Sequence, residues 1–138
     1  MDKLTKIIVE HTITCLMFLI VGINSLCAQE LEAPLVHTVL FWLHHPESKD
    51  DQLLFEKAIN KLIKTNPQKI NGYLGKPAKT KMREVVDSSY TYFYQMTFEN
   101  AEAEAAYQID STHLIFIKEA EHLWKKVIVY DAFPLLYE

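Results

Sequence analysis

The sequence predicts an α+β protein of the ferredoxin-like class, with a four-stranded antiparallel sheet and its helices on one face. Three observations support this prediction. Four short strand-like segments and two regions of helical periodicity follow one another in the order β-α-β-β-α-β. No internal repeat or low-complexity segment follows residue 34. The composition, 49% hydrophobic and 23% charged, is that of an ordinary globular protein.

The first half of the pattern is a strand, a helix and a weaker strand. Residues 35–43 (LVHTVLFWL) are too short for a good helix, and we expect a strand buried on both faces. Ser48 can cap a helix of about 16 residues, which Pro67 stops because proline disfavours helical geometry in the residue before it. Residues 70–78 carry two glycines and Pro77, so this strand is expected to bend or to lie at an edge.

The second half contains the clearest strand of the chain. Residues 89–98 (SYTYFYQMTF) alternate, with tyrosines, methionine and phenylalanine on one side. Asn100 is expected to cap a helix that ends at about Tyr107. A second helix is predicted over about residues 112–125, and residues 126–133 (KVIVYDAF) are expected to form the last strand.

Helices on one face leave the other face of the sheet without a cover. Tyrosines and aliphatic residues occur on both faces of the first, third and last strands, which is too much apolar surface for a lone sheet. We therefore expect a homodimer formed through the sheet faces, so that the partner is a second copy of the chain.

The N-terminus has the order of a secretory signal peptide. Lys3 and Lys6 precede an apolar run over residues 13–23, and small or polar residues follow up to Ala28. The run is shorter than the roughly 20 residues needed to cross a bilayer. We expect residues 1–28 to be a cleaved signal and the protein to be exported, to a periplasm or outside the cell.

The expected domains follow from this cleavage. Residues 29–34 are a short leader, and residues 35–138 are the folded domain. Both cysteines, Cys15 and Cys27, lie in the signal, so the mature chain has no disulfide and no cysteine nucleophile. The alternative is a lipoprotein acylated at Cys27, although Leu26 stands where a lipobox needs a small residue. Contact with a membrane is expected only through an uncleaved or lipidated signal segment.

The charge of the chain argues against a nucleic-acid partner. Its 14 basic and 18 acidic residues give a net charge of −4. Removal of residues 1–28 takes away two of each sign and leaves this net charge unchanged. Binding to nucleic acid rests largely on clustered lysine and arginine. The basic residues between Lys76 and Arg83 lie in a loop-like stretch and are expected to be solvated.

Several segments resemble the stress-responsive A/B barrel domain (Dabb) family over about residues 35–133. The similar segments are VHTV at 36–39, the glycine-bounded stretch 72–75 and the strand 92–98. The most specific is YQIDSTH at 107–113, which resembles a tyrosine followed by a His-Pro-x-His turn. Asp110 and Ser111 stand here in place of the first histidine and the proline, so half of that tetrapeptide is missing.

The resemblance implies a dimeric α+β barrel and a candidate site. Many members of the family have no known activity, whereas plant polyketide cyclases among them use a cavity tyrosine and histidines without a cofactor. The positions that the resemblance implies here are His37, Tyr107 and His113.

The residues themselves point to the same cavity. His37 shares its strand face with Val39 and Phe41, so we expect it in an apolar interior that keeps it neutral. His113 begins a helix six residues after Tyr107, and the turn can bring the two side chains together. A neutral histidine could then abstract a proton while the phenol binds a carbonyl oxygen. The structural alternatives are a core histidine, a helix cap at His113 and a core tyrosine at Tyr107.

Asp131 is the other candidate of the site. It interrupts an apolar strand, where a carboxylate is costly without a partner, and could orient His37 or His113. The alternative is that it ends the strand and accepts from a neighbouring amide. The ligand pocket is predicted to include four strand residues: Val39, Phe41, Tyr92 and Tyr94.

No metal site or cofactor site is expected from the spacing of residues. His44 and His45 are adjacent, so their side chains diverge, and no third ligand follows at a recognisable spacing. His122 is expected to be a solvated helix residue. The sequence has no Gly-rich phosphate loop, serine nucleophile elbow or HExxH motif.

Three functions are compatible with these observations. The first is an exported, stress-related dimer that binds a small hydrophobic ligand in its barrel cavity. The second is a cofactor-independent lyase or cyclase for enolisation or aldol-type chemistry, with His113 as base and Tyr107 as oxyanion donor. The third is a cofactor-free oxygenase, because related folds share a cavity without sharing chemistry. We favour the first.

Overall fold

The computed structural model describes residues 34–135, so the predicted signal peptide 1–28 and nearly all of the leader lie outside the described residues. The described residues form four strands, three α-helices and one 3₁₀ turn. In chain order these are β1 (Leu35–Leu43), α2 (Lys49–Thr65), β2 (Lys69–Gly75), β3 (Tyr92–Phe98), α3 (Ala101–Ile109), α4 (Ser111–Ala120), η2 (Glu121–Leu123) and β4 (Trp124–Ala132).

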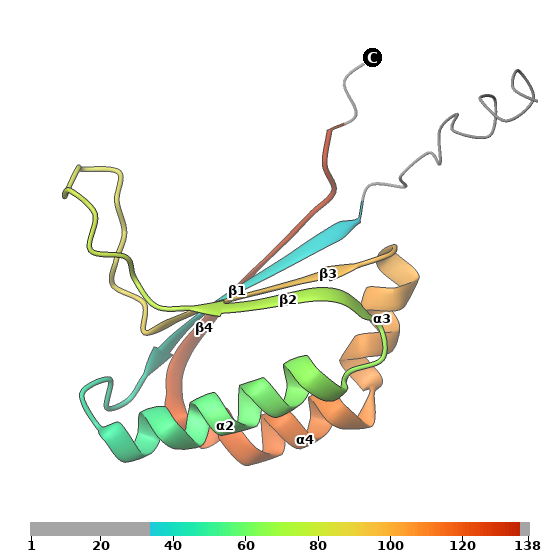
Figure 1. The fold of residues 1–138 in the computed structure, drawn as a ribbon, viewed down its shortest axis with the longest axis horizontal. Helices are drawn as coiled ribbons and strands as arrows, with labels where there is room; N and C mark the ends of the chain where they lie inside the picture. The colour runs from blue at the N-terminus through green and yellow to red at the C-terminus, as the bar shows by residue number, and fades with distance from the viewer. Residues whose placement is uncertain (1–33, 136–138) are drawn as a thin grey trace, which may run out of the picture. The chain divides into compact units, whose positions relative to one another are not determined.

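The four strands form one antiparallel sheet in the order β2-β3-β1-β4. All three helices lie on the same side of it (Figure 1). The ferredoxin-like class is therefore confirmed, with the sheet open, and the two helical stretches predicted between the third and last strands correspond to α3 and α4. Strand β1 is central, with β3 on one side and β4 on the other, so its inward side chains face the helices.

Burial alternates along the central strands. In β1 and β3, every second residue from Leu35 and from Tyr92 is buried, and the residues between them are half-buried. The core is made by the inward side chains of these strands together with helical residues such as Phe55, Ile59 and Phe116. The prediction that residues 35–43 are buried on both faces is wrong for the single chain, because no element of the described residues covers the outer face of the sheet.

Helix α2 begins and ends at polar caps. The Ser48 hydroxyl accepts a hydrogen bond from the Asp51 backbone N–H. Asp50 and Asp51 lie in the first turn, where the positive end of the helix dipole stabilises their carboxylates. Asn66 follows the last turn, as predicted from Pro67. The buried residues Phe55, Ala58, Ile59 and Leu62 lie along one stripe of the helix.

The helix predicted over 112–125 is shorter in the structure. Helix α4 ends at Ala120, and Trp124 already belongs to β4, paired with Leu43. The Trp124 ring stacks on Phe116 at a centroid distance of 5.6 Å and packs against Phe41 at 5.2 Å. These contacts with a neighbouring strand and with α4 place Trp124 in the sheet and outweigh the local helix propensity that its spacing indicated.

The other element boundaries differ by a few residues from those predicted from the sequence. The first short helix continues past Tyr107 to Ile109, and β2 starts at Lys69 and ends at Gly75, before Pro77. Strand β3 starts at Tyr92 and not at the predicted Ser89. The residue before it, Thr91, donates its backbone N–H to the Phe41 carbonyl of β1. Among residues 34–135, no helix is both long and apolar enough to cross a membrane.

Candidate functional site

A pocket of about 200 Å³ lies between the inner face of the sheet and the helices α3 and α4. Its lining is mostly apolar and aromatic, with polar groups at a few positions. The lining residues are His37, Val39, Phe41, Tyr94, Tyr107, Gln108, His113, Phe116, Ile117, Trp124, Val127 and Val129. An apolar pocket with a few convergent polar groups is typical of a small-molecule site.

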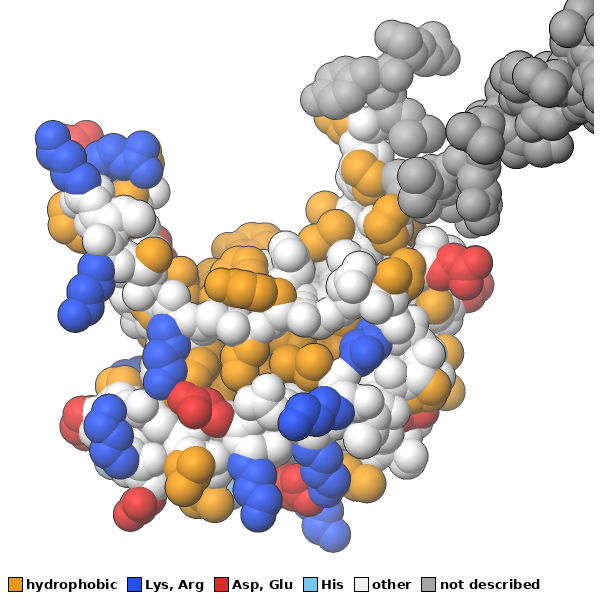
Figure 2. Space-filling view, viewed as in Figure 1, with side chains coloured by type: hydrophobic (Ala, Val, Ile, Leu, Met, Phe, Trp, Pro, Cys, Tyr) orange, Lys and Arg blue, Asp and Glu red, His pale blue; other side chains and the backbone are white. Residues whose placement is uncertain are grey.

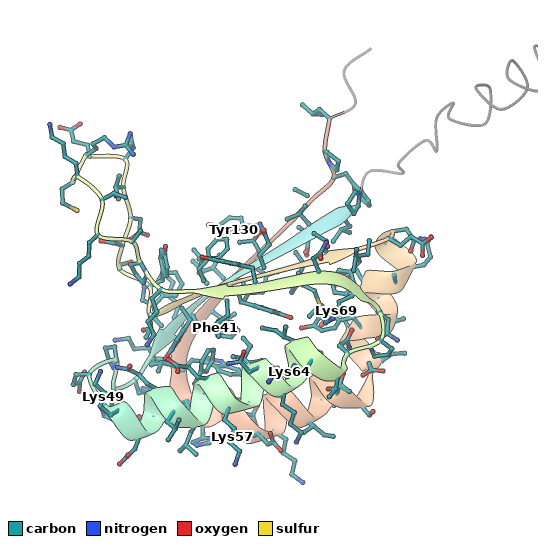
Figure 3. The ribbon with its side chains drawn as sticks, in the orientation of Figure 1. Phe41, Lys49, Lys57, Lys64, Lys69 and Tyr130 are labelled. Atoms are coloured by element: carbon teal, nitrogen blue, oxygen red, sulfur yellow. The ribbon has the colours of Figure 1, made fainter. Side chains whose placement is uncertain are left out.

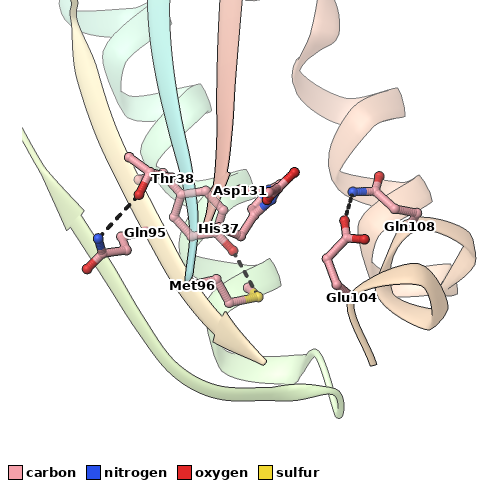
Figure 4. A network of polar contacts seen from close by, with 8 residues as sticks. His37, Thr38, Gln95, Met96, Glu104, Gln108 and Asp131 are labelled. Atoms are coloured by element: carbon pink, nitrogen blue, oxygen red, sulfur yellow. Dashed lines mark hydrogen bonds and ion pairs between the residues drawn. The ribbon is translucent and has the colours of Figure 1, made fainter. Parts of the chain in front are cut away.

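His37 and Asp131 form the polar pair on the sheet side of this pocket. They are directly paired in the β1–β4 register, and His37 Nδ1 lies 2.7 Å from Asp131 Oδ1 (Figure 4). His37 is 3% exposed, and its ring meets Tyr107 edge-on at a centroid distance of 5.7 Å. A carboxylate can only accept, so Nδ1 donates and the neutral imidazole has its lone pair on Nε2. Of the two histidines considered as partners of Asp131, His37 is the one that it contacts.

Tyr107 and His113 form the helical side of the pocket. The turn between α3 and α4 brings their rings to a centroid distance of 4.3 Å, with an interplanar angle of 34°. His113 Nδ1 lies 3.2 Å from the Gln108 carbonyl oxygen, which accepts its hydrogen. The neutral His113 ring therefore also has its lone pair on Nε2.

The surroundings keep both of these groups neutral. Burial, assisted by the nearby His37, lowers the pKa of His113 below its ordinary value of 6.5. Burial raises the pKa of the Tyr107 hydroxyl above its ordinary value of 10.0. At neutral pH the site thus holds an unprotonated imidazole beside a phenol that keeps its proton, one suited to accept a hydrogen and the other to donate one.

The turn that carries these residues is held by a polar network around Asp110. One Asp110 carboxylate oxygen accepts from the Thr112 N–H, at 2.8 Å, and from the Thr112 hydroxyl. The Asn66 side-chain amide donates to the Thr112 hydroxyl at 2.9 Å and to Asp110 at 3.4 Å. Asp110 is thus the N-cap of α4 and links the turn to the end of α2. This is the structural role of Asp110, one of the two residues at which the turn departs from the resemblance described above.

The predicted pocket residues separate into two groups. Val39, Phe41 and Tyr94 line the pocket, whereas Tyr92 does not. The Tyr92 ring stacks on Phe55, and its hydroxyl donates to Glu56 Oε1 at 2.6 Å. Tyr92 is the first residue of β3, and there its ring packs over α2 and not over the pocket. Asp131 is not a lining residue either and reaches the pocket through His37.

Two polar residues at the site, Gln108 and Glu104, were not predicted from the sequence, and neither were the apolar lining residues of α4 and β4. Gln108 lines the pocket, and its side-chain amide donates to a carboxylate oxygen of Glu104, one turn earlier on α3 (Figure 4). Glu104 lies near His37 and Asp131, with one ligand atom of each residue within 4.8 Å of the others. The spacing of four between Glu104 and Gln108 was the available signal, but such pairs are common on solvated helix surfaces.

The remaining histidines lie elsewhere. His44 and His45 are exposed in the turn after β1, and His122 is exposed in η2. None of the three lines the pocket.

Comparison with known proteins gives a family and a fold. The family model described as "Stress responsive A/B Barrel Domain" matches residues 35–134. A search of curated proteins finds no match.

Solved structures share the fold at low sequence identity. A protein from Arabidopsis thaliana is 24% identical with a TM-score of 0.63, covering 76% of this chain and 99% of its own. A Dabb family protein with a ferredoxin-like fold from Mesorhizobium loti is 19% identical with a TM-score of 0.62, covering 75% and 98%. The hydroxynitrile lyase of Passiflora edulis is 16% identical with a TM-score of 0.65, covering 78% and 98%.

Two further structures with this fold are described as dimeric. One is from Thermobifida fusca, 16% identical with a TM-score of 0.60, and covers 79% of this chain and 96% of its own. The other is from Bacteroides fragilis, 15% identical with a TM-score of 0.56, and covers 72% and 95%.

Proposed function

The chain belongs to the stress-responsive A/B barrel domain family, and on that premise we propose that it binds a small, largely apolar carbonyl compound in the pocket between sheet and helices. The observation that carries the proposal is the pairing of Tyr107 and His113, two neutral polar groups with rings 4.3 Å apart in a mostly apolar lining. The Tyr107 hydroxyl donates to the carbonyl oxygen, and the apolar lining holds the rest of the ligand.

The size of the pocket limits the ligand. Pockets for drug-sized molecules have volumes of about 300–1,000 Å³, whereas this one is about 200 Å³. Methyl ketones of the size of acetophenone or 2-heptanone are therefore suitable probes. They combine one hydrogen-bond acceptor with an apolar body.

Binding is tested by thermal shift with these ketones on the wild type and on two variants. A ligand that binds the folded state raises the melting temperature. We expect a saturable rise for the wild type and a weaker one for Tyr107→Phe and His113→Gln. The control is His122→Gln, whose exposed ring lies outside the pocket. Equal shifts in all four proteins would remove Tyr107 and His113 from the site.

A second function, proton abstraction beside a carbonyl group, is supported by the closeness of the His113 and Tyr107 rings, 4.3 Å apart, with burial keeping the imidazole unprotonated. His113 Nε2 would take a proton from the carbon next to the carbonyl, breaking that C–H bond. The bonding pair then forms the C=C bond, and the carbonyl π pair moves to oxygen, where the Tyr107 hydroxyl stabilises the charge. The proton returns to carbon in the reverse step, so enolisation needs no cofactor.

Hydrogen exchange tests this second function directly. The methyl protons of acetophenone in D₂O are followed by proton NMR with and without the protein. We expect faster loss of the methyl signal with the wild type and background loss with His113→Gln. Binding without exchange would support the first function alone.

We also propose that two copies pair through the open sheet face. Hydrophobic side chains gather on this face, away from the helices (Figure 2), and Tyr130 points from it while Phe41 points toward the helices (Figure 3). The register places Leu40 between Phe93 and Ile128 on the same face, and Tyr73 and Tyr130 there are 60% and 57% exposed. The dimeric structures with this fold support this arrangement.

Export stays a proposal that rests on the N-terminal sequence. The basic residues Lys3 and Lys6, followed by the apolar run 13–23, are the pattern of a secretory signal. Mass spectrometry of the protein recovered from its native host is the test. We expect a chain that begins at Gln29, whereas a lipid adduct on Cys27 would establish the lipoprotein alternative.

A further inference from the structure

We propose that His37, Glu104 and Asp131 bind a divalent transition-metal ion at the edge of the pocket. The three residues come from β1, α3 and β4, and each offers one ligand atom within 4.8 Å of the other two (Figure 4). The linear spacing of 37, 104 and 131 follows no metal-binding motif, so the fold alone brings these ligands together. The proposal is independent of what the pocket binds.

The distances suit a metal after small movements. Histidine nitrogen and carboxylate oxygen bind zinc at about 2.0–2.2 Å, which places tetrahedral ligands roughly 3.4 Å apart. His37 Nδ1 and Asp131 Oδ1 are 2.7 Å apart with the Nδ1 hydrogen between them, so an ion bound to Nδ1 takes the place of that hydrogen, which moves to Nε2, and the two ligand atoms move slightly apart. The buried His37 ring is fixed by its packing against Phe98 and Tyr107. The Asp131 side chain is 47% exposed and Glu104 is half-buried, so both carboxylates can adjust by rotation.

The charge balance of the cluster favours a cation. Two carboxylates this close repel each other, and more strongly beside a buried ring than in water. Among residues 34–135, the lysines that form ion pairs contact Glu56 and Glu119, and no lysine or arginine pairs with Glu104 or Asp131. A divalent ion would neutralise both carboxylates, and one imidazole with two carboxylates is a ligand set that suits zinc or manganese.

The coordination would leave room for a further ligand. Three protein ligands are typical of sites that keep one position open for water or substrate. His37 lines the pocket, so an ion bound to it lies where a carbonyl oxygen held in the pocket can reach it. The second contact of Glu104, with the Gln108 amide, orients its carboxylate.

The test is calorimetric titration of the full-length protein, stripped of metal with a chelator, with Zn²⁺ and separately with Mn²⁺. We expect one ion per chain for at least one of the two metals. Glu104→Gln and Asp131→Asn should each weaken binding by about 100-fold, and Glu102→Gln, an exposed residue of the same helix, should leave it unchanged. Circular dichroism of the metal-free variants checks that each keeps its fold.

Two further readouts make the result decisive. Co²⁺ in place of the ion should give visible absorption bands that Glu104→Gln abolishes. Absence of binding in the wild type, or binding that Glu104→Gln leaves unchanged, would overturn the proposal. If the chelated protein still binds acetophenone while no metal binds, the metal site is wrong and the proposed carbonyl pocket stands.

Discussion

His37 and Asp131 are opposite residues of neighbouring strands, joined by a 2.7 Å contact between an imidazole nitrogen and a carboxylate oxygen. The histidine is buried, and the aspartate is the partner that its ring nitrogen needs there. Without a bound ion, this pair fixes the tautomer of His37, with the hydrogen on Nδ1 and the lone pair on Nε2. The same pair also contributes to the stability of the sheet.

Removal of the carboxylate should destabilise the fold. Asp131→Ala leaves a buried ring nitrogen without a partner, and we expect a loss of about 1–3 kcal/mol in the free energy of unfolding. Asp131→Asn keeps an acceptor oxygen and should cost less. Urea unfolding of the two variants measures both values. Equal losses would show that the hydrogen bond to His37 is not what stabilises the pair.

The cap of α4 is expected to contribute both stability and geometry. Asp110→Ala removes the acceptor for the Thr112 N–H, and N-cap losses of this kind cost about 0.5–2 kcal/mol. The neighbouring Ser111→Ala is the control, because Ser111 is not the cap. The variant should also bind ketones more weakly, since the cap holds the turn between Tyr107 and His113. Unchanged ketone affinity in a destabilised variant would show that the cap supports the fold alone.

The pH dependence of stability should carry the signature of His113. Its pKa is lowered in the folded state, so the unfolded chain binds the proton more tightly. Above about pH 6.5 neither state is protonated at this group and it makes no difference. As the pH falls from 6.5 through the lower folded-state pKa, stability is lost.

Thermal unfolding between pH 8 and pH 5 checks this sign. The melting temperature of the wild type should fall more steeply below pH 6.5 than that of His113→Gln, which cannot titrate. His122→Gln, whose ring is exposed, should follow the wild type. A variant curve parallel to that of the wild type would mean that burial does not shift the pKa of His113.

The open sheet face gives a prediction about assembly. Tyr130→Glu places a charge in the middle of the proposed interface and should convert a dimer into monomers. Leu114→Glu is the matched control, because Leu114 is 55% exposed on α4, on the helical side of the molecule. Analytical ultracentrifugation of both variants measures the mass. A dimer that survives Tyr130→Glu, or a wild-type monomer at micromolar concentration, would contradict the pairing.

Local patterns predicted the elements that depend on local interactions. The alternation of β3, the Ser48 cap and the stop before Pro67 are all present in the structure. Trp124 was misplaced in a helix because its contacts with Phe41 and Phe116 are tertiary and leave no mark on helical spacing. The outer face of β1 was expected to be buried because composition records apolar surface and does not say which neighbour covers it.

The site residues likewise divide into those placed by local interactions, which the sequence predicted, and those placed by tertiary contacts. The closeness of Tyr107 and His113 comes from a short turn and was predictable from their spacing. His37 and Asp131 are 94 residues apart in the chain, and their contact depends on the register of β1 and β4. The sequence therefore indicated a histidine partner for Asp131 but could not say whether it is His37 or His113. Glu104 was missed because its distance from His37 is set by the way α3 packs against the sheet.

The central claim is that Tyr107 and His113 hold a carbonyl ligand, and an NMR titration with acetophenone tests it most directly. The ring signals of Tyr107 and His113, assigned from Tyr107→Phe and His113→Gln, should shift together and saturably in the wild type. Loss of the phenol should weaken binding by about 3- to 10-fold, the value of one hydrogen bond. Saturable binding that leaves both rings unshifted, with the same affinity in Tyr107→Phe, would contradict the account.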